Sequence, residues 1–381
     1  MYFGQGHSQS PPGSGENSRA AETSERRPGQ GVTVINRRTV KWVVAACALG
    51  GIAWALYRLN TASESFDWKL FWASIARLRW GWLAISLVPI FATYVGRALR
   101  WAVFLKPLKS QPSLPNLISA TVIGFTAIAL FGRAGEFVRP YLIALKERVP
   151  VPSQMAAWLL ERLFDILMAL LCFGFALGRV AGHQVRPGSG LGWVLAFGGR
   201  VSWVISVIAL LLLVTMRHLA VPLSHRLLRG LKYLPEKQFE RAEHLITTFV
   251  KGIESTKSDG ALLMVLLYSL LEWVLIISCY WCLAQSFSNM VQLSLADVIV
   301  FVGFVSFGST VQIPGVGGGV QVIAVLVLTE FFNVRVESAT FFALVLWIIM
   351  FVVVVPVGFG MALRDGLTFR SLRRLSRGEP A

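Results

Sequence analysis

The sequence predicts an all-α polytopic membrane protein with about six full spans and two re-entrant helical hairpins, arranged as an inverted repeat. Three observations support this fold class. Of the 381 residues, 55% are hydrophobic and only 15% are charged, unlike an ordinary soluble domain. Several apolar windows reach the roughly 20 residues that a helix needs to cross a bilayer. Lys and Arg gather in a few loops between these windows, and such loops stay on the cytoplasmic side.

The elements follow from these windows in order. Residues 1–36 lack the apolar content of a core, so we expect a disordered cytoplasmic tail before a transmembrane domain at 37–365. The spans are predicted at 42–59, 81–105, 153–178, 191–216, 260–287 and 338–363. Residues 217–259, rich in Lys, Arg and Glu, are predicted to form a cytoplasmic amphipathic insertion, and 366–381 a basic cytoplasmic tail.

The first hairpin is predicted between two basic loops. Lys106 and Lys109 precede one apolar stretch, and Lys146 and Arg148 follow the sequence "RAGEFVRPYLIAL". That sequence is too short and too polar to return across the bilayer. Non-helical backbone at membrane depth is tolerated only where protein buries it or where it lines a wet cavity. Residues 116–145 are therefore predicted to enter the membrane and leave on the same side.

The second hairpin, 295–332, has two apolar arms around a Pro and Gly cluster that cannot continue a helix. No Lys or Arg occurs between Lys257 and Arg335, which places this hairpin on the opposite side. The order span, span, hairpin, span then occurs twice, at about 42–178 and about 191–363, with the directions reversed. Inverted repeats with broken helices are typical of transporters.

Charged side chains inside the predicted membrane segments are the candidate binding residues, because such groups mark substrate routes or ion pairs. Together with two glycines of the second turn, they are Arg133, Glu136, Arg139, Glu161, Arg162, Asp165, Glu272, Gly315 and Gly318. Guanidinium groups match phosphate oxygens, and the bend from Gly132 to Gly135 frees backbone N–H groups for an anion. Purely structural ion pairing is the alternative. Arg97 and Arg100 lie near the inner end of their span, where snorkelling toward water is an equal alternative to a role in the site.

No catalytic residue, metal site or cofactor is predicted. The five His residues lie in tails or loops, and no phosphate-binding G-x-x-x-x-G-K-[ST] sequence occurs. Cys47, Cys172, Cys279 and Cys282 lie in apolar windows and are interpreted as packing residues. The net charge of +16 resides beside the spans, which favours anionic lipid head groups over nucleic acid as partners.

Three motifs, "GRAGEFVRPYLIAL", "ERLFDIL" and "IPGVGGG", follow one another before a final long span. In this order they resemble the flippase-like family known from the transmembrane region of lysylphosphatidylglycerol synthase, the multiple peptide resistance factor family, over about residues 40–365. The resemblance implies a multi-pass protein of a bacterial or archaeal inner membrane, with both termini cytoplasmic, that moves a lipid head group between leaflets. It places the charged motif of the family on Arg133, Glu136, Arg139, Glu161, Arg162 and Asp165.

The sequence departs from that family in two ways. Gln321 stands near the place where many relatives have Glu, and the soluble synthase domain is expected to be lacking. The expected function is that of a lipid flippase or a transporter of a lipid-linked substrate, not an enzyme. It would bind the head group of an anionic phospholipid or a polyprenyl phosphate at the Arg cluster. One alternative is a membrane-embedded transferase with Glu161 or Asp165 as general base, and another is a scaffold that docks through 217–259. A homodimer is left open.

Overall fold

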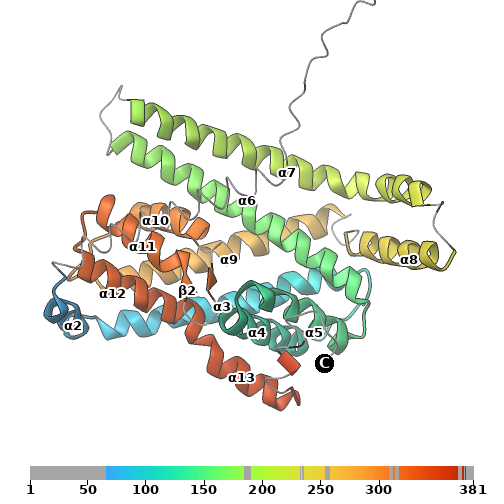
Figure 1. Ribbon diagram of the computed structural model, residues 1–381, viewed down its shortest axis with the longest axis horizontal. Coiled ribbons are helices and arrows are strands. Elements are labelled where there is room, and N and C mark those ends of the chain that lie inside the picture. The colour runs from blue at the N-terminus through green and yellow to red at the C-terminus, as the bar shows by residue number, and fades with distance from the viewer. Residues whose placement is uncertain are drawn as a thin grey trace, which may run out of the picture. The chain divides into compact units, whose positions relative to one another are not determined.

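The computed structural model describes residues 66–183, 190–231, 233, 236–253, 258–308, 312–313, 317–367, 371–372 and 374. The chain divides into two compact units, Met1–Tyr57 and Arg58–Ala381, and every described residue belongs to the second. The predicted tail 1–36 and the predicted first span 42–59 therefore lie outside the described residues. Figure 1 shows that the second unit is built from helices, which confirms the predicted fold class.

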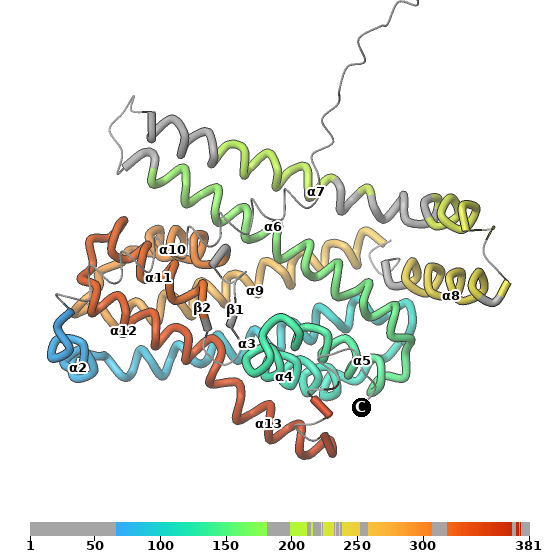
Figure 2. The backbone as a smooth tube through the Cα atoms, viewed as in Figure 1, coloured from blue at the N-terminus to red at the C-terminus, as the bar shows by residue number. Residues whose placement is uncertain are grey.

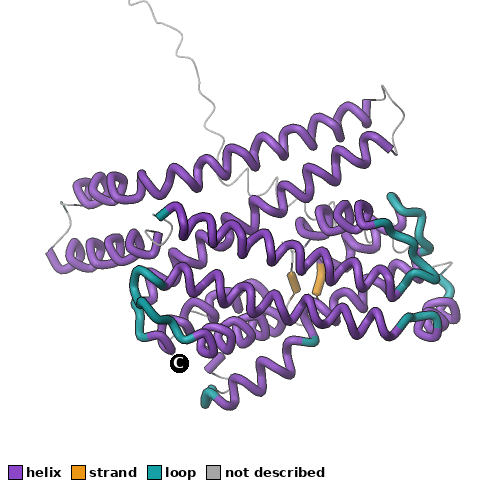
Figure 3. Tube along the Cα trace, turned by 180° about the vertical axis from the view of Figure 1, so that it is seen from behind, coloured by secondary structure: helices purple, strands orange, loops and turns teal. Residues whose placement is uncertain are grey.

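The elements of this unit follow one another as shown in Figures 1 and 2. They are α2 (Trp68–Ala76), α3 (Trp80–Leu105), α4 (Leu114–Phe131), the 3₁₀ helix η1 (Gly132–Phe137), α5 (Val138–Glu147), α6 (Val151–His183), α7 (Gly190–Leu231), α8 (Glu236–Ile253), α9 (Asp259–Ser286), α10 (Leu295–Gly308), β1 (Gln312–Ile313), β2 (Gly317–Gly318), α11 (Gly319–Glu330), α12 (Val336–Trp347), the π-helix η3 (Ile348–Val352) and α13 (Val354–Arg364). The two short strands, orange in Figure 3, lie side by side. They pair antiparallel, with Gln312 opposite Gly318. Helix α2 was not predicted from the sequence.

Within the described residues, five helical stretches are long and apolar enough to cross a membrane. They are Trp80–Leu105, Leu114–Glu147, Val151–Val180, Asp259–Ser286 and Val336–Arg364. The first and the last three coincide with predicted spans, and Leu114–Glu147 contains the predicted first hairpin. The predicted span at 191–216 lies within α7, whose described apolar part is Gly199–Leu211.

The surface of this unit carries many large apolar side chains, as expected of a protein that faces lipid. On α7 they include Trp203 and Ile208, and on α9 they include Leu267 and Leu270, each about half exposed. The described part of the predicted insertion 217–259 includes about the last third of α7 and all of α8. Helix α8 packs on α6, where Phe249 and Val250 contact Ala156. The predicted insertion is therefore attached to the helix bundle through α8.

Helices α4 and α5 form an antiparallel hairpin that turns through η1. At its base, the carboxylate of Glu147 accepts a hydrogen bond from the backbone N–H of Ser113 at 3.1 Å. Further along, Lys146 Nζ donates to Ser119 Oγ at 2.8 Å. Near the turn, Gly124 lies so close to α5 that an added Cβ would collide with it. Entry of this hairpin into a membrane stays a prediction.

Helices of the first half of the unit pack on helices of the second half. Helix α6, which follows the first hairpin, packs on α10 of the second, and α13, after the second hairpin, packs on α4 of the first. Helices α3 and α9 pack on each other. Gly303 permits the contact of α10 with α6, because its Cβ would lie 2.8 Å from the carbonyl oxygen of Cys172. This is the exchange that a two-fold repeat requires, although the inverted repeat itself stays a prediction.

We expect Gly358→Ala and Gly360→Ala, two changes on α13, to have opposite effects. A Cβ at Gly358 would collide with Thr126 and lie 2.9 Å from the carbonyl oxygen of Val122, whereas a Cβ at Gly360 would have nothing within 4 Å. Overpacking should lower the free energy of unfolding by about 1–3 kcal/mol at Gly358. At Gly360, alanine should raise it by about 0.5–1 kcal/mol, because alanine favours a helix interior. Thermal unfolding of the purified variants measures both effects, and equal shifts would contradict the close contact of α13 with α4.

Candidate functional site

A cluster of charged side chains lies where α3, α5, α6 and α9 meet. It contains four arginines and three carboxylates, namely Arg97, Arg100, Arg139, Glu161, Arg162, Asp165 and Glu272. The helical period brings them together, because Arg97 and Arg100 are three residues apart on α3 and Glu161 and Asp165 four apart on α6. When all are ionised, the cluster carries one more positive charge than negative charges.

Glu161 is the most enclosed carboxylate of this cluster, with a side chain that is 0% exposed. Arg139 binds it through both terminal nitrogens: Nη1 lies 3.1 Å from Oε1, and Nη2 contacts Oε2. Arg100 Nη2 donates to Oε1 as well. A buried carboxylate needs partners of this kind, because an unpaired charge is costly in a medium of low dielectric constant. Glu161 therefore joins α3, α5 and α6.

Arg100 does not snorkel toward water, contrary to one of the two alternatives that the sequence left open. Its side chain is 0% exposed. Nη1 donates to Asp165 Oδ1 at 3.1 Å and to Ser269 Oγ at 2.9 Å. These bonds link α3 to α6 and α9. Arg100 thus belongs to the core of the cluster.

Glu272 lies between the two arginines of α3. Arg97 Nη2 is 2.5 Å from Oε1, and Arg100 Nη2 is 3.1 Å from Oε2. Neither of these ion pairs has the geometry of a hydrogen bond, so among the described residues both Glu272 oxygens lack a hydrogen-bond partner. The same holds for Arg97 Nε and Nη1. Such buried atoms are costly and can be satisfied by polar atoms of a bound molecule.

Two aromatic rings hold the guanidinium groups in place. Arg139 lies over Trp101, 4.4 Å from the ring centroid, and Arg97 lies over Phe125 at 4.7 Å. The indole of Trp101 is itself fixed, because its Nε1 donates to Gln154 Oε1 at 2.8 Å. Stacking of this kind attracts a cation to the ring face and limits its rotation.

A cavity of about 490 Å³ opens beside the cluster. Its charged wall is formed by Arg97, Arg133, Glu136, Arg162, Asp165 and Glu272. Its apolar wall comes from α9, α10, α11 and η3 and includes Ile276, Val302, Val305, Val320, Met350 and Phe351. The cavity is large enough for part of a small ligand, and its two walls suit a molecule with a polar and an apolar part.

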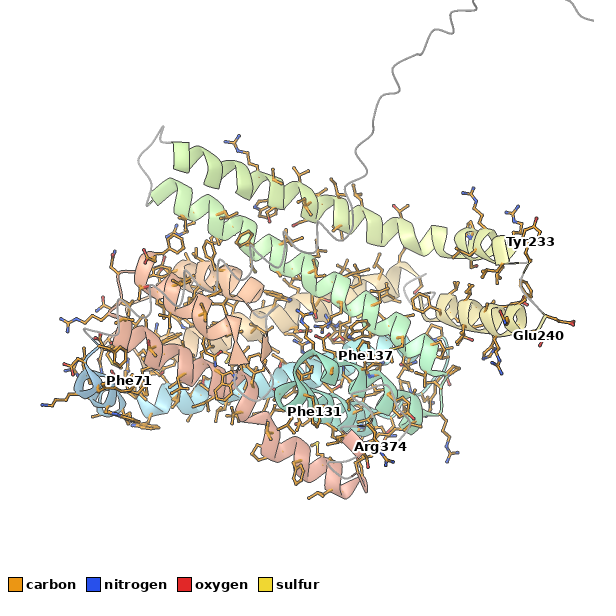
Figure 4. The ribbon with its side chains drawn as sticks, viewed as in Figure 1. Phe71, Phe131, Phe137, Tyr233, Glu240 and Arg374 are labelled. Atoms are coloured by element: carbon orange, nitrogen blue, oxygen red, sulfur yellow. The ribbon has the colours of Figure 1, made fainter. Side chains whose placement is uncertain are left out.

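The tip of the first hairpin lies at this cavity. Phe131, which precedes η1, and Phe137, which ends it, are labelled in Figure 4; η1 carries Arg133 and Glu136. Gly132 turns the chain with a positive φ of 64°, and Gly135 packs directly on the backbone of α4. Strand β1 of the second hairpin lies beside η1. The turn of the first hairpin and strand β1 of the second therefore lie side by side.

The structure divides the predicted binding residues into two groups. Arg133, Glu136, Arg162, Asp165 and Glu272 line the cavity, whereas Arg139 and Glu161 are absent from its lining and pair with each other. Gly318 has a φ of 126° and directly precedes α11, where its N–H donates to the Gln321 side chain, but it is not a lining residue either. Gly315 lies outside the described residues.

Sequence reasoning left Arg97 undecided and did not include Tyr94 or Tyr280, all of which line the cavity. A signal for α3 was available. Tyr94, Arg97 and Trp101 follow one another at helical spacing, so that polar and aromatic side chains share one face of an apolar helix. A polar face inside a span indicates a buried site.

The fold and the site together define a multi-pass helical membrane protein with a charged internal cavity. A family model described as the lysylphosphatidylglycerol synthase transmembrane region matches residues 42–358, and the chain therefore belongs to this family. The match confirms the resemblance drawn from the three motifs. No curated protein and no solved structure gives a significant match.

Proposed function

We propose that the protein moves an amphiphile with an anionic head group, a phospholipid or a polyprenyl-phosphate-linked lipid, from one membrane leaflet to the other. The main observation that supports this proposal is the cavity. It combines an arginine-rich wall with an apolar wall and lies between two hairpins. The net charge of the adjoining cluster favours an anion, and broken helices beside a central site are characteristic of transporters.

Arg133, Arg162 and Arg97 are the head-group ligands in this proposal. All three line the cavity, and Arg133 has the most exposed side chain among them, at 56%. Its ion pair with Glu136 is loose, at 4.0 Å. Arg139, expected from the sequence to bind the phosphate, is instead bonded to Glu161 and lies outside the cavity lining.

The geometry argues against Glu161 and Asp165 as the general base of a transferase reaction. A general base must have a free carboxylate oxygen within reach of its substrate. Both oxygens of Glu161 are bonded to arginines. Asp165 lines the cavity but pairs with Arg162 at 2.9 Å and with Arg100 at 3.1 Å. We therefore assign the carboxylates to fixing the arginines and to contacting hydroxyl or amino groups of a head group.

Arg133→Gln is expected to slow translocation in proteoliposomes by roughly 10- to 100-fold, because one charge-assisted hydrogen bond contributes about 1.5–3 kcal/mol. Thermal unfolding should change little, since the side chain is largely exposed. The measurement is the rate at which a fluorescent analogue of phosphatidylglycerol reaches the outer leaflet.

Arg148→Gln is the matched control, since Arg148 ends the same hairpin, is exposed and does not line the cavity. This variant should translocate the analogue at the unmodified rate. Normal translocation by the Arg133 variant would refute the proposed head-group site.

A further inference from the structure

Helix α2, the start of α3 and the start of α12 lie at the same end of the bundle (Figure 1). A second pocket at this end is lined by residues of α2 and α12. The backbone N–H of Arg79, just before α3, donates to the carbonyl of Ser286 at the end of α9 with an N–O distance of 2.9 Å. The loops after α9 and α11 lie here as well. Lys106 and Lys109 follow the other end of α3, so this pocket and those lysines are at opposite ends of one candidate span.

Two arginines line this pocket of about 480 Å³ together with uncharged polar side chains. They are Arg77, which ends α2, and Arg335, which precedes α12. Ser288, Asn289, Gln292, Asn333 and Ser338 supply the polar lining. Among the described residues, neither guanidinium lies within ion-pair distance of a carboxylate.

Two carboxylates near this end bind backbone N–H groups instead. Asp67 accepts from the N–H groups of Lys69 and Leu70 at 2.8 and 3.2 Å and so caps α2. Glu337 of α12 accepts from the N–H of Asp67 at 3.3 Å. These bonds fix α2 on α12 and leave the positive charge of the pocket uncompensated by either acid.

The turn that carries Arg77 is held in a defined position. Asn289 Nδ2 donates to the carbonyl oxygen of Arg77 at 3.1 Å, and Arg79 Nη1 donates to Ser288 Oγ at 3.3 Å. Both bonds connect the end of α2 to the loop after α9. The pocket thus has a preformed wall, which lowers the entropic cost of binding.

Helix α2 is built to lie at a membrane surface. Its inner face buries Phe71, whose ring packs on Phe341 at 5.4 Å between centroids, and Figure 4 labels Phe71 on this helix. Outward, Trp68 is 64% exposed and Trp72 60%, and Trp80 at the start of α3 is 60% exposed. Tryptophan gathers at the boundary between lipid tails and water, where its ring contacts tails and its N–H contacts water. The three rings therefore place the pocket at the level of the lipid head groups.

We propose that Arg77 and Arg335 bind the phosphate of an anionic phospholipid that belongs to the leaflet at this end of the bundle. The lipid is a bound neighbour of the protein and not the transported molecule, so the site is independent of the proposed function. Two guanidinium groups and the surrounding amide and hydroxyl groups bind the phosphate oxygens. The acyl chains run along the bundle beside the exposed tryptophans.

Native mass spectrometry of the full chain in phosphatidylcholine nanodiscs with a minor fraction of phosphatidylglycerol tests this site. Replacing both arginines, Arg77→Gln with Arg335→Gln, should lower retention of the most tightly held phosphatidylglycerol about tenfold, since each basic group near a membrane surface contributes appreciably to lipid attraction. Lys69→Gln, an exposed change on α2 outside the pocket, should leave retention unchanged. Equal retention by the double variant and this control would overturn the proposal.

Two further experiments distinguish this pocket from the central cavity and a bound phospholipid from free phosphate. Arg133→Gln should retain this lipid, so that loss of translocation and loss of this site are distinguishable; loss of the lipid in that variant would assign it to the central cavity and overturn the inference. Inorganic phosphate added to protein in pure phosphatidylcholine nanodiscs should give no heat of binding that depends on Arg77 and Arg335. Such a heat, without retained phosphatidylglycerol, would assign the pocket to free phosphate.

Discussion

Glu161→Gln is expected to destabilise the folded protein by about 3–5 kcal/mol, the usual cost of breaking a buried ion pair from one side. Glu161 is 0% exposed and accepts from Arg100 and Arg139, so the amide would leave two buried guanidinium groups without their shared counter-charge. Thermal unfolding of detergent-purified protein should show a much lower midpoint. Little folded protein should be recovered from membranes.

Two companion variants make this prediction specific. Glu136→Gln removes a carboxylate of the same type whose ion pair with Arg133 is loose, at 4.0 Å, so it should change stability by less than about 1 kcal/mol. Combining Glu161→Gln with Arg139→Gln restores the charge balance and should recover part of the lost stability, because removing both partners costs less than removing one. An unchanged midpoint in Glu161→Gln would contradict the buried cluster.

Gly135→Ala should lower the free energy of unfolding by about 3 kcal/mol, at the upper end of the range for overpacking. An added Cβ would overlap backbone atoms of Ala127 and Ile128 on α4. A backbone cannot rotate away as a side chain can, so the whole turn η1 would have to lift. Because η1 carries Arg133 and Glu136, the charged wall of the cavity would shift, and translocation should fall with stability.

Gly96→Ala is the matched control for that change. Gly96 is buried in α3 next to Arg97, but a Cβ there would meet nothing within 4 Å. Its stability should stay equal or rise slightly, since alanine favours a helix. Unfolding and translocation measured on both variants separate a local collision from a general effect of adding a methyl group. Equal behaviour would contradict the contact between η1 and α4.

The helical class and the ends of two long spans could be predicted, because a hydrophobic run of about 20 residues usually forms a membrane-spanning helix. The window 81–105 differs from α3 by one residue at its start, and the window 260–287 differs from α9 by one residue at each end. Helix α2 escaped prediction because its nine residues fall short of any span, and its tryptophans became informative only with their exposure known. The break of the last span at η3 was also missed, because "WIIMFVVVV" is uniformly apolar.

The sequence identified most of the charged residues of the candidate site. It did not show which of them line the cavity and which pair with one another. Hydropathy identifies Arg139 and Arg133 equally as charges beside an apolar arm. It does not reveal that Arg139 faces Trp101 and Glu161 while Arg133 faces the cavity, since this depends on how α3 and α6 cross α5. Arg97 and Arg100 were undecided for the same reason: depth along one helix does not show whether a neighbouring helix supplies an acid.

The first hairpin is tethered along its whole length, which limits how the cavity could open. Near the tip Arg139 is bonded to α6, and at the base Glu147 binds Lys109 at 2.7 Å while Lys146 pairs with Asp365. Swinging this hairpin outward would separate several ion pairs at once. The described cavity wall from the second hairpin consists of Val302, Val305, Ser306 and Val320, none of which has a charged side chain that could form an ion pair. If the protein transports a lipid as proposed, we expect α4 and α5 to stay in place while α10 and α11 move to open the cavity.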